Sequence, residues 1–154
     1  MFKVVLYQPE IPPNTGNIIR LCANSGSSLH LIHPLGFSMD EKSLRRAGMD
    51  YRELANMEEY TSMQAYLEQQ EGSRMFACST RGRQDYTRVA YKPGDTLLFG
   101  PETRGLPQEM LDAMQAEQLI RIPMCPDNRS LNLSNAVAII LYEAWRQQGF
   151  AGAG

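Results

Sequence analysis

The chain has 154 residues, of which 43% are hydrophobic and 21% charged, a balance typical of one globular domain rather than a disordered chain. The formal net charge of −2 gives no overall electrostatic sign of a nucleic-acid partner, so any RNA contact would depend on local basic clusters. No apolar run approaches the length of a membrane span, and the N-terminal run lacks the pattern of a signal peptide. We therefore expect a cytoplasmic protein with no membrane partner, one domain over residues 1–154, and a disordered tail from about residue 150.

Apolar runs and helix-period patterns alternate along most of the chain. The first strand, 2–7, is ended by prolines, and the helix that follows is expected to be capped near Asn14 and to stop at Gly26. The Arg- and Gly-bearing loop 80–94 is long enough to suggest a functional or mobile segment. Strands that alternate with helices predict an α/β fold with a mostly parallel sheet flanked by helices. The remaining expected elements are strands at 29–33, 74–79, 96–99 and 119–122 and helices at 40–47, 61–70, 107–114 and 133–148.

Two clusters of basic residues could contact a polyanion, although a solvated surface is the more common role of such a cluster taken alone. His30 and His33 lie close together without partner ligands at metal-site spacing. The 3 cysteines are far apart and form no Cys-x-x-Cys pair. We therefore expect neither a disulfide framework nor a metal site. The basic clusters are Lys42, Arg45, Arg46 and Arg52, and then Arg81, Arg83 and Arg88.

The stretch 120–145 is the part of the chain that most clearly suggests a ligand. A short apolar strand leads into a loop with two prolines, then a polar turn at 128–134, then a long apolar helix. The turn has more small hydrogen-bonding side chains than a helix start needs, and it offers backbone N–H groups. Two faces of the helix could be buried, one against its own sheet and one against another surface. These faces are Val137, Ile140, Leu141, Ala144 and Trp145, and then Asn135, Ile139, Tyr142 and Arg146.

Three of the expected strands end in residues that suit a ligand, at 78–80, 100–102 and 122–124. In open parallel sheets, ligands bind outside the carboxyl ends of the strands. Gly100 would let a backbone approach a ligand closely, and Glu102 could accept hydrogen bonds from a ligand or orient the loop. A strand, a turn and a helix cap explain this stretch equally well. The chain has no Gly-x-Gly-x-x-Gly, P-loop or Gly-x-Ser-x-Gly pattern, so NAD, ATP and serine-hydrolase chemistry lose most of their support.

Three stretches resemble, in the same order, the successive motifs of the SPOUT methyltransferases. They are Pro13–Arg20, Leu98–Leu106 and Ile120–Glu143. The match covers nearly the whole chain, and three motifs in order are far more specific than any one of them. The opening stretch Tyr7–Asn17 resembles the small, single-domain subgroup that 2′-O-methylates the wobble nucleotide of tRNA. The resemblance implies a C-terminal deep trefoil knot, which physical reasoning alone would not suggest because knots are very rare.

The resemblance also implies S-adenosyl-L-methionine as the methyl donor, S-adenosyl-L-homocysteine as the product, and no metal. In the family, the cofactor lies bent in the knot and is held largely by backbone groups of three loops. These loops follow the strand ends that the residue pattern singles out. Carried onto the matching positions, the cofactor-binding residues are Cys78, Gly100, Ile122, Ser130 and Leu131.

Arg20 matches the arginine that the family assigns to the reaction centre. It could hold the substrate phosphate and orient the ribose, or it could remove the 2′-hydroxyl proton. Because a guanidinium is effectively never deprotonated, we favour positioning, with the proton lost late or through a relay. Asn14, Glu102 and Asn132 match polar positions that brace the site, and we group them with Arg20 as catalytic residues. Tyr142 could face the site or pack at an interface.

SPOUT enzymes are obligate dimers, so the resemblance implies a homodimer in which each site is completed by the partner. We expect no added RNA-binding domain, so contacts with tRNA would rest on Arg20, Arg45, Arg46 and Tyr142. The expected activity is 2′-O-methylation of the ribose of the wobble nucleotide, cytidine or uridine at position 34 of tRNA. Two alternatives stay open. One is a 2′-O-methyltransferase of another tRNA or ribosomal RNA position, and the other is a non-catalytic knot protein that binds RNA or S-adenosyl-L-methionine.

Overall fold

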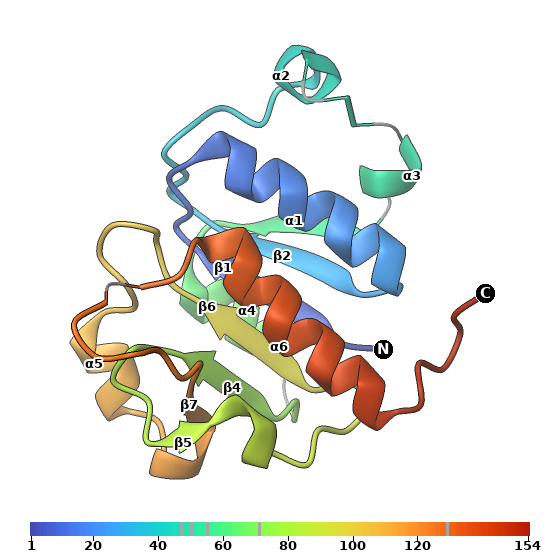
Figure 1. Cartoon of the computed structure of the whole chain (residues 1–154). Coiled ribbons are helices and arrows are strands. Elements are labelled where there is room, and N and C mark those ends of the chain that lie inside the picture. The colour runs from blue at the N-terminus through green and yellow to red at the C-terminus, as the bar shows by residue number, and fades with distance from the viewer. Residues whose placement is uncertain (47, 50, 55, 71, 129) are drawn as a thin grey trace.

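The computed structural model describes residues 1–46, 48–49, 51–54, 56–70, 72–128 and 130–154. Ala47 of the expected basic helix and Arg129 of the expected polar turn lie outside these ranges. The described strands form one sheet in the order β3-β2-β1-β6-β4-β7-β5, and every described pairing is parallel. The prediction of a mostly parallel sheet flanked by helices is therefore confirmed (Figure 1). The strands are β1 (Lys3–Tyr7), β2 (Ser28–Ile32), β3 (Met57–Tyr60), β4 (Met75–Cys78), β5 (Gln84–Asp85), β6 (Thr96–Phe99) and β7 (Leu119–Arg121).

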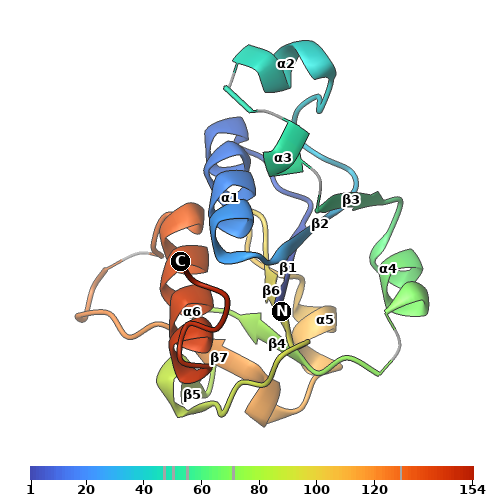
Figure 2. The same cartoon turned by 90° about the vertical axis from the view of Figure 1, so that its right-hand side faces the viewer.

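Helices cover both faces of the sheet. Helices α1 and α6 lie side by side on one face, and α4 and α5 cover the other (Figures 1 and 2). Alternate residues of β1 therefore enter different cores: Val4 and Leu6 pack under α1 and α6, whereas Val5 packs on the opposite side. The helices are α1 (Pro12–Ser25), α2 (Glu41–Arg46), α3 (Tyr51–Leu54), α4 (Met63–Gln69), α5 (Gln108–Asp112) and α6 (Leu133–Gln147), with 3-10 turns η1 (Tyr86–Arg88) and η2 (Ala116–Gln118).

Helix α1 starts earlier than its sequence suggests. It begins at Pro12, with Ile11 as the N-cap, so the predicted cap near Asn14 is wrong. Proline suits this first turn because its φ angle is already helical and its missing N–H would have no partner there. Gly26 ends the helix with φ of 68°, as predicted, because this left-handed conformation is easy for glycine.

Helix α6 is capped by the side chain of Asn132, which accepts hydrogen bonds from the backbone N–H groups of Ser134 at 2.9 Å and Asn135 at 3.3 Å. On the face that carries Val137, four of the five predicted residues are fully buried against the sheet and α1, and Trp145 is partly buried. On the second predicted face, Asn135, Tyr142 and Arg146 are exposed within this chain and Ile139 is half-buried. The helix therefore presents an outer surface that its own fold does not cover.

Strand β3 and helix α3 were not predicted from the sequence. The β3 strand pairs only with β2 in the described sheet, and its central residues Glu58 and Glu59 are exposed. An edge strand with both faces partly in water does not show the apolar alternation on which the prediction depends. The loop 80–94 likewise contains the two-residue strand β5 and the turn η1.

Candidate active site

Sheet order explains where the candidate site forms. Strands β6, β4 and β7 are neighbours and all run in the same direction, so the loops that follow them emerge together at the carboxyl edge of the sheet. These loops and the stretch before α6 enclose a cleft of about 1170 Å³, and the loop between β1 and α1 adds one wall. A cleft of this size is large enough for a nucleoside-sized ligand.

All five residues predicted to bind the cofactor line this cleft. Cys78 and Ile122 form half-buried walls, whereas Ser130 and Leu131 lie on the exposed stretch before α6. Burial raises the pKa of the Cys78 thiol to about 12, so this side chain is a neutral wall of the cleft at physiological pH. The fifth residue, Gly100, belongs to the loop after β6.

Gly100 is required by the loop itself. A Cβ atom there would lie 2.4 Å from the backbone nitrogen of Leu106 and 2.6 Å from the carbonyl carbon of Gly105. The loop can therefore fold back against the end of β6 only if this residue has no side chain. The sequence suggested glycine for close approach to a ligand, and the geometry adds a close approach of the chain to itself.

Two carboxylates join the loop after β6 to the segment before α1. Glu102 accepts hydrogen bonds from the backbone N–H groups of Glu10 and Ile11, each at 2.8 Å, and from Nδ2 of Asn14 at 3.3 Å. In return, Oε1 of Glu10 accepts from the backbone N–H of Thr103 at 2.9 Å and from its Oγ1 at 2.8 Å. The hydrogen bonds from Thr103 hold the pKa of Glu10 below its ordinary value. We call this arrangement the carboxylate clasp.

The hydrogen bonding continues from the clasp to the closing helix. Oδ1 of Asn14 accepts from Nδ2 of Asn132 at 3.0 Å, and Asn132 caps α6 through its side-chain oxygen Oδ1. Glu102, Asn14 and Asn132 thus form one chain of contacts that links all three resembling motifs. Because both oxygens of Glu102 are engaged, the geometry favours a bracing role for this carboxylate over that of a proton acceptor.

Arg20 and Tyr142 lie away from the cleft. Arg20 is on the exposed side of α1, where its Nε donates to Oε1 of Glu53 at 3.2 Å. Tyr142 is 37% exposed on the outer face of α6, and its ring lies edge-on to that of Trp145 with 5.4 Å between centroids. The structure therefore brings Asn14, Glu102 and Asn132 together with the predicted cofactor residues but leaves Arg20 and Tyr142 outside.

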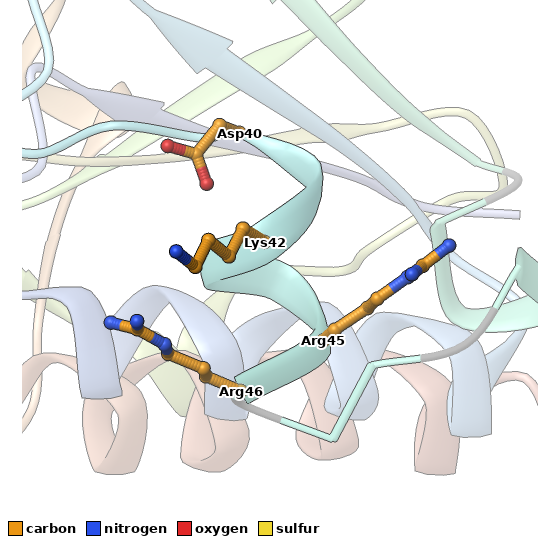
Figure 3. Close-up of a pocket in the computed structure, with 4 residues that line it drawn as sticks. All are labelled: Asp40, Lys42, Arg45 and Arg46. Carbon is orange, nitrogen blue, oxygen red and sulfur yellow. The ribbon is translucent and has the colours of Figure 1, made fainter.

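Arg45 and Arg46 border a separate hollow of about 570 Å³ on α2, together with Asp40 and Lys42. Figure 3 shows Lys42 and Arg46 extending to one side of the helix and Arg45 to the other. Among the described residues that line this hollow, three cations and one carboxylate give a net positive charge, which suits a polyanion such as RNA.

Sequence reasoning did not single out Glu10, which completes the clasp, or Arg104 and Arg121, which line the cleft. Arg81 also lines the cleft, and the sequence had placed it in a basic cluster without assigning it to the site. Among the described residues, no group of three or more His, Cys, Asp or Glu side chains could hold a metal ion. No helix in the described ranges is long and apolar enough to cross a membrane.

The family model of the SpoU rRNA Methylase family matches residues 1–142. The chain belongs to this family. The resemblance to SPOUT methyltransferases is thereby confirmed, and the fold is that of the SpoU methyltransferases.

A relative from Methylovorus glucosotrophus is 58% identical over 153 residues, which cover 99% of both chains. A relative from Escherichia coli K12 is also 58% identical and covers 99% of this chain and 98% of its own. Both relatives are named tRNA (cytidine(34)-2′-O)-methyltransferase.

Solved structures agree with this placement in the SpoU family. A structure that concerns the 2-OH methylation of C/U34 on tRNA matches with a TM-score of 0.89 at 46% identity and covers 97% of both chains. The SpoU methyltransferase AviRb from Streptomyces viridochromogenes, in complex with AdoMet, matches with a TM-score of 0.81 at 27% identity. That match covers 95% of this chain and 60% of AviRb.

Proposed function

We propose that this SpoU-family chain is an enzyme that transfers a methyl group from S-adenosyl-L-methionine to the ribose 2′-oxygen of nucleotide 34, the wobble cytidine or uridine of tRNA. The observation that carries the proposal is the 58% identity, over nearly the full length of both chains, to relatives named for this activity. The cleft at the carboxyl edge of the sheet supports it, because it lies where the three resembling motifs meet.

S-adenosyl-L-methionine is the proposed cofactor, and S-adenosyl-L-homocysteine the product. The cleft fits it in size, in its mixed apolar and polar lining, and in the many backbone groups of its loops. Cys78, Gly100, Ile122, Ser130 and Leu131 are the residues proposed to hold it. Its sulfonium centre supplies an activated methyl group, so the protein needs to provide alignment rather than a metal.

Alignment is therefore the main task proposed for the protein's own side chains. Asn14, Glu102 and Asn132 hold the walls of the cleft in register through the contacts described above. Arg20 is proposed to bind a phosphate next to the wobble nucleotide and to orient its ribose, for which a planar guanidinium is well suited. In-line placement of two reacting atoms can supply much of the rate of such a transfer.

Helix geometry explains why two chains would be needed. Arg20 follows Asn14 by six positions on α1, which corresponds to about 9 Å along the axis and a rotation of roughly 120° away from it. One helix therefore cannot direct both side chains into the same cleft. We propose a homodimer in which Arg20 of one chain completes the site of the other. The exposed outer face of α6, with Tyr142, is the proposed interface.

Contacts with tRNA are proposed for Arg20 and for the positive surface around Arg45 and Arg46. A dimer would join two such surfaces, which offsets the net charge of −2 on each chain. We further propose that residues 1–154 form one domain with a disordered tail. The C-terminal segment is proposed to form the deep trefoil knot of the family, and the enzyme is proposed to be cytoplasmic. Membership of the family supports the knot, and the tRNA-modifying activity named for the relatives supports the location.

A methylation assay tests the proposal. Purified protein is incubated with labelled S-adenosyl-L-methionine and with tRNA from cells that lack the protein, and the labelled nucleotide is mapped by mass spectrometry. We expect label on the ribose of nucleotide 34, and loss of that label in Arg20→Ala. Label at another position would assign the chemistry to a different RNA target. Cofactor binding without label on tRNA or ribosomal RNA would contradict an enzymatic role. A mass independent of concentration and equal to one chain, measured by light scattering, would overturn the dimer.

A further inference from the structure

Two described residues, Gly48 after α2 and Glu53 in α3, contact the guanidinium of Arg20. Nε of Arg20 donates to Oε1 of Glu53 at 3.2 Å, and Nη2 donates to the carbonyl oxygen of Gly48 at 3.4 Å. Among the residues that the structure describes, neither of these contacts engages Nη1, which leaves that amino group available to a ligand. The guanidinium is therefore held on the side of Nε and Nη2, and its Nη1 group points away from these two contacts.

Glu53 is the more firmly held member of the pair. Its side chain is 19% exposed, compared with 53% for Arg20, and it belongs to α3, which packs against α1. The neighbouring Leu54 and Met49 are partly buried against the main core. Figure 2 shows α3 beside α1, the helix that carries Arg20. Arg20 thus adopts its orientation from a carboxylate that packing has already placed.

An arginine in this position would otherwise be mobile. Its long side chain has many rotamers, and ordering them when a substrate binds is unfavourable. A carboxylate that receives Nε–H fixes both the position and the plane of the guanidinium before binding. The remaining donors can then meet a phosphate without a further search for geometry.

We propose that Glu53 is a positioning residue that orients Arg20 for its contact with the wobble nucleotide. This inference rests on the proposed function of Arg20 as a substrate-orienting residue. It adds α3, a helix of four residues outside the three resembling motifs, to the machinery of the reaction.

The test compares Glu53→Ala and Glu53→Gln with the wild type and with the control Glu68→Ala, which removes an exposed carboxylate on α4. We expect Glu53→Ala to lower kcat for tRNA methylation by about 10- to 100-fold, because small errors of placement have effects of this size. Glu53→Gln keeps an oxygen that accepts from Nε and should recover part of the loss. Affinity for S-adenosyl-L-homocysteine and the thermal midpoint should match those of Glu68→Ala.

A second background separates positioning from a general structural role. Lysine at position 20 keeps the positive charge but has no Nε–H group to be oriented. In Arg20→Lys, we therefore expect Glu53→Ala to cause no further loss in kcat or in tRNA affinity measured by filter binding. An equal loss in both backgrounds would overturn the proposal, as would wild-type kcat in Glu53→Ala. If Glu53→Ala does not fold, Glu53→Gln in the two backgrounds carries the comparison.

Failure of the proposed function has a different result. In that case the wild type itself transfers no label to tRNA, whatever stands at position 53. The filter-binding cycle still reports whether Glu53 acts through Arg20 on RNA affinity. A wild type that methylates nucleotide 34 while Glu53→Ala does so equally well would instead refute this inference alone.

Discussion

Removal of the Glu102 carboxylate is the sharpest test of the clasp. The N-terminus of α1 depends on this side chain, because Ile11 at the N-cap provides no capping oxygen and the next two residues are prolines. Glu102 supplies the missing acceptor for the backbone N–H groups of Glu10 and Ile11 and also binds Asn14. Its negative charge lies near the positive end of the helix dipole, which adds to the stabilisation.

The magnitude follows from the state of each donor after the change Glu102→Ala. The N–H of Ile11 is exposed and can turn to water, whereas the N–H of Glu10 and the Asn14 amide are partly buried and lose their charged partner. A hydrogen bond to a charged group contributes about 1.5–3 kcal/mol, so we expect a total loss of about 2–4 kcal/mol. For a chain of this size, that corresponds to a fall in Tm of about 5–15 °C.

Urea denaturation followed by circular dichroism measures this loss, at one fixed protein concentration because a dimer would make stability depend on it. Glu102→Gln keeps one acceptor oxygen and should lose roughly half as much. Glu109→Ala is the matched control, since it removes an exposed glutamate from the nearby helix α5 and should cost less than about 1 kcal/mol. A free energy of unfolding for Glu102→Ala within about 0.5 kcal/mol of the wild type would refute the reasoning.

Three further outcomes are expected. Gly100→Ala should reduce S-adenosyl-L-homocysteine affinity, measured by calorimetry, by more than about tenfold, because the new Cβ would collide with backbone atoms. In the control Gly16→Ala, the new Cβ meets only Met49 Cε at 3.8 Å, so this variant should bind normally. Burial lowers the pKa of His30 below its ordinary 6.5, so the unfolded chain takes up a proton at this position before the folded chain does. The free energy of unfolding should therefore fall as pH drops below about 6.5. Urea titrations of His30→Gln should show a weaker dependence of this free energy on pH in that range. A maleimide at pH 8 should label exposed Cys125 well before Cys78, whose pKa is raised to about 12 by burial, as peptide mass mapping would reveal.

Much of the fold could be predicted because its central strands β1, β2 and β6 are largely buried on both faces. Strand β6, Thr96–Phe99, is buried at every position, and such a short apolar run between turn residues is typical of a central parallel strand. Strand β3 could not be predicted in this way, since two of its four residues are exposed glutamates. Its place in the sheet depends on pairing with β2 and on the aromatic contact between Tyr60 and Tyr66, at 5.1 Å between ring centroids.

The position of the cleft could also be predicted, from the rule that parallel strands direct their carboxyl ends to one edge. The roles of its polar residues could not, because they depend on partners distant in sequence. Asn14 and Asn132 are 118 positions apart and Asn14 and Glu102 are 88 apart, yet these pairs form hydrogen bonds. Periodicity and capping rules act within a few residues, so neither contact follows from them.

Glu53 shows the same limit at its clearest. It lies 33 positions after Arg20, in a helix of four residues that is too short for an apolar period. A surface ion pair contributes little to stability, so a search for stabilising interactions would also pass over it. A role for Glu53 in the reaction follows only when Arg20 is assigned to the substrate and the structure places a packed carboxylate against Nε of Arg20. The ion pair then acts by orienting the guanidinium, so its loss should change kcat, whereas the free energy of unfolding would change little.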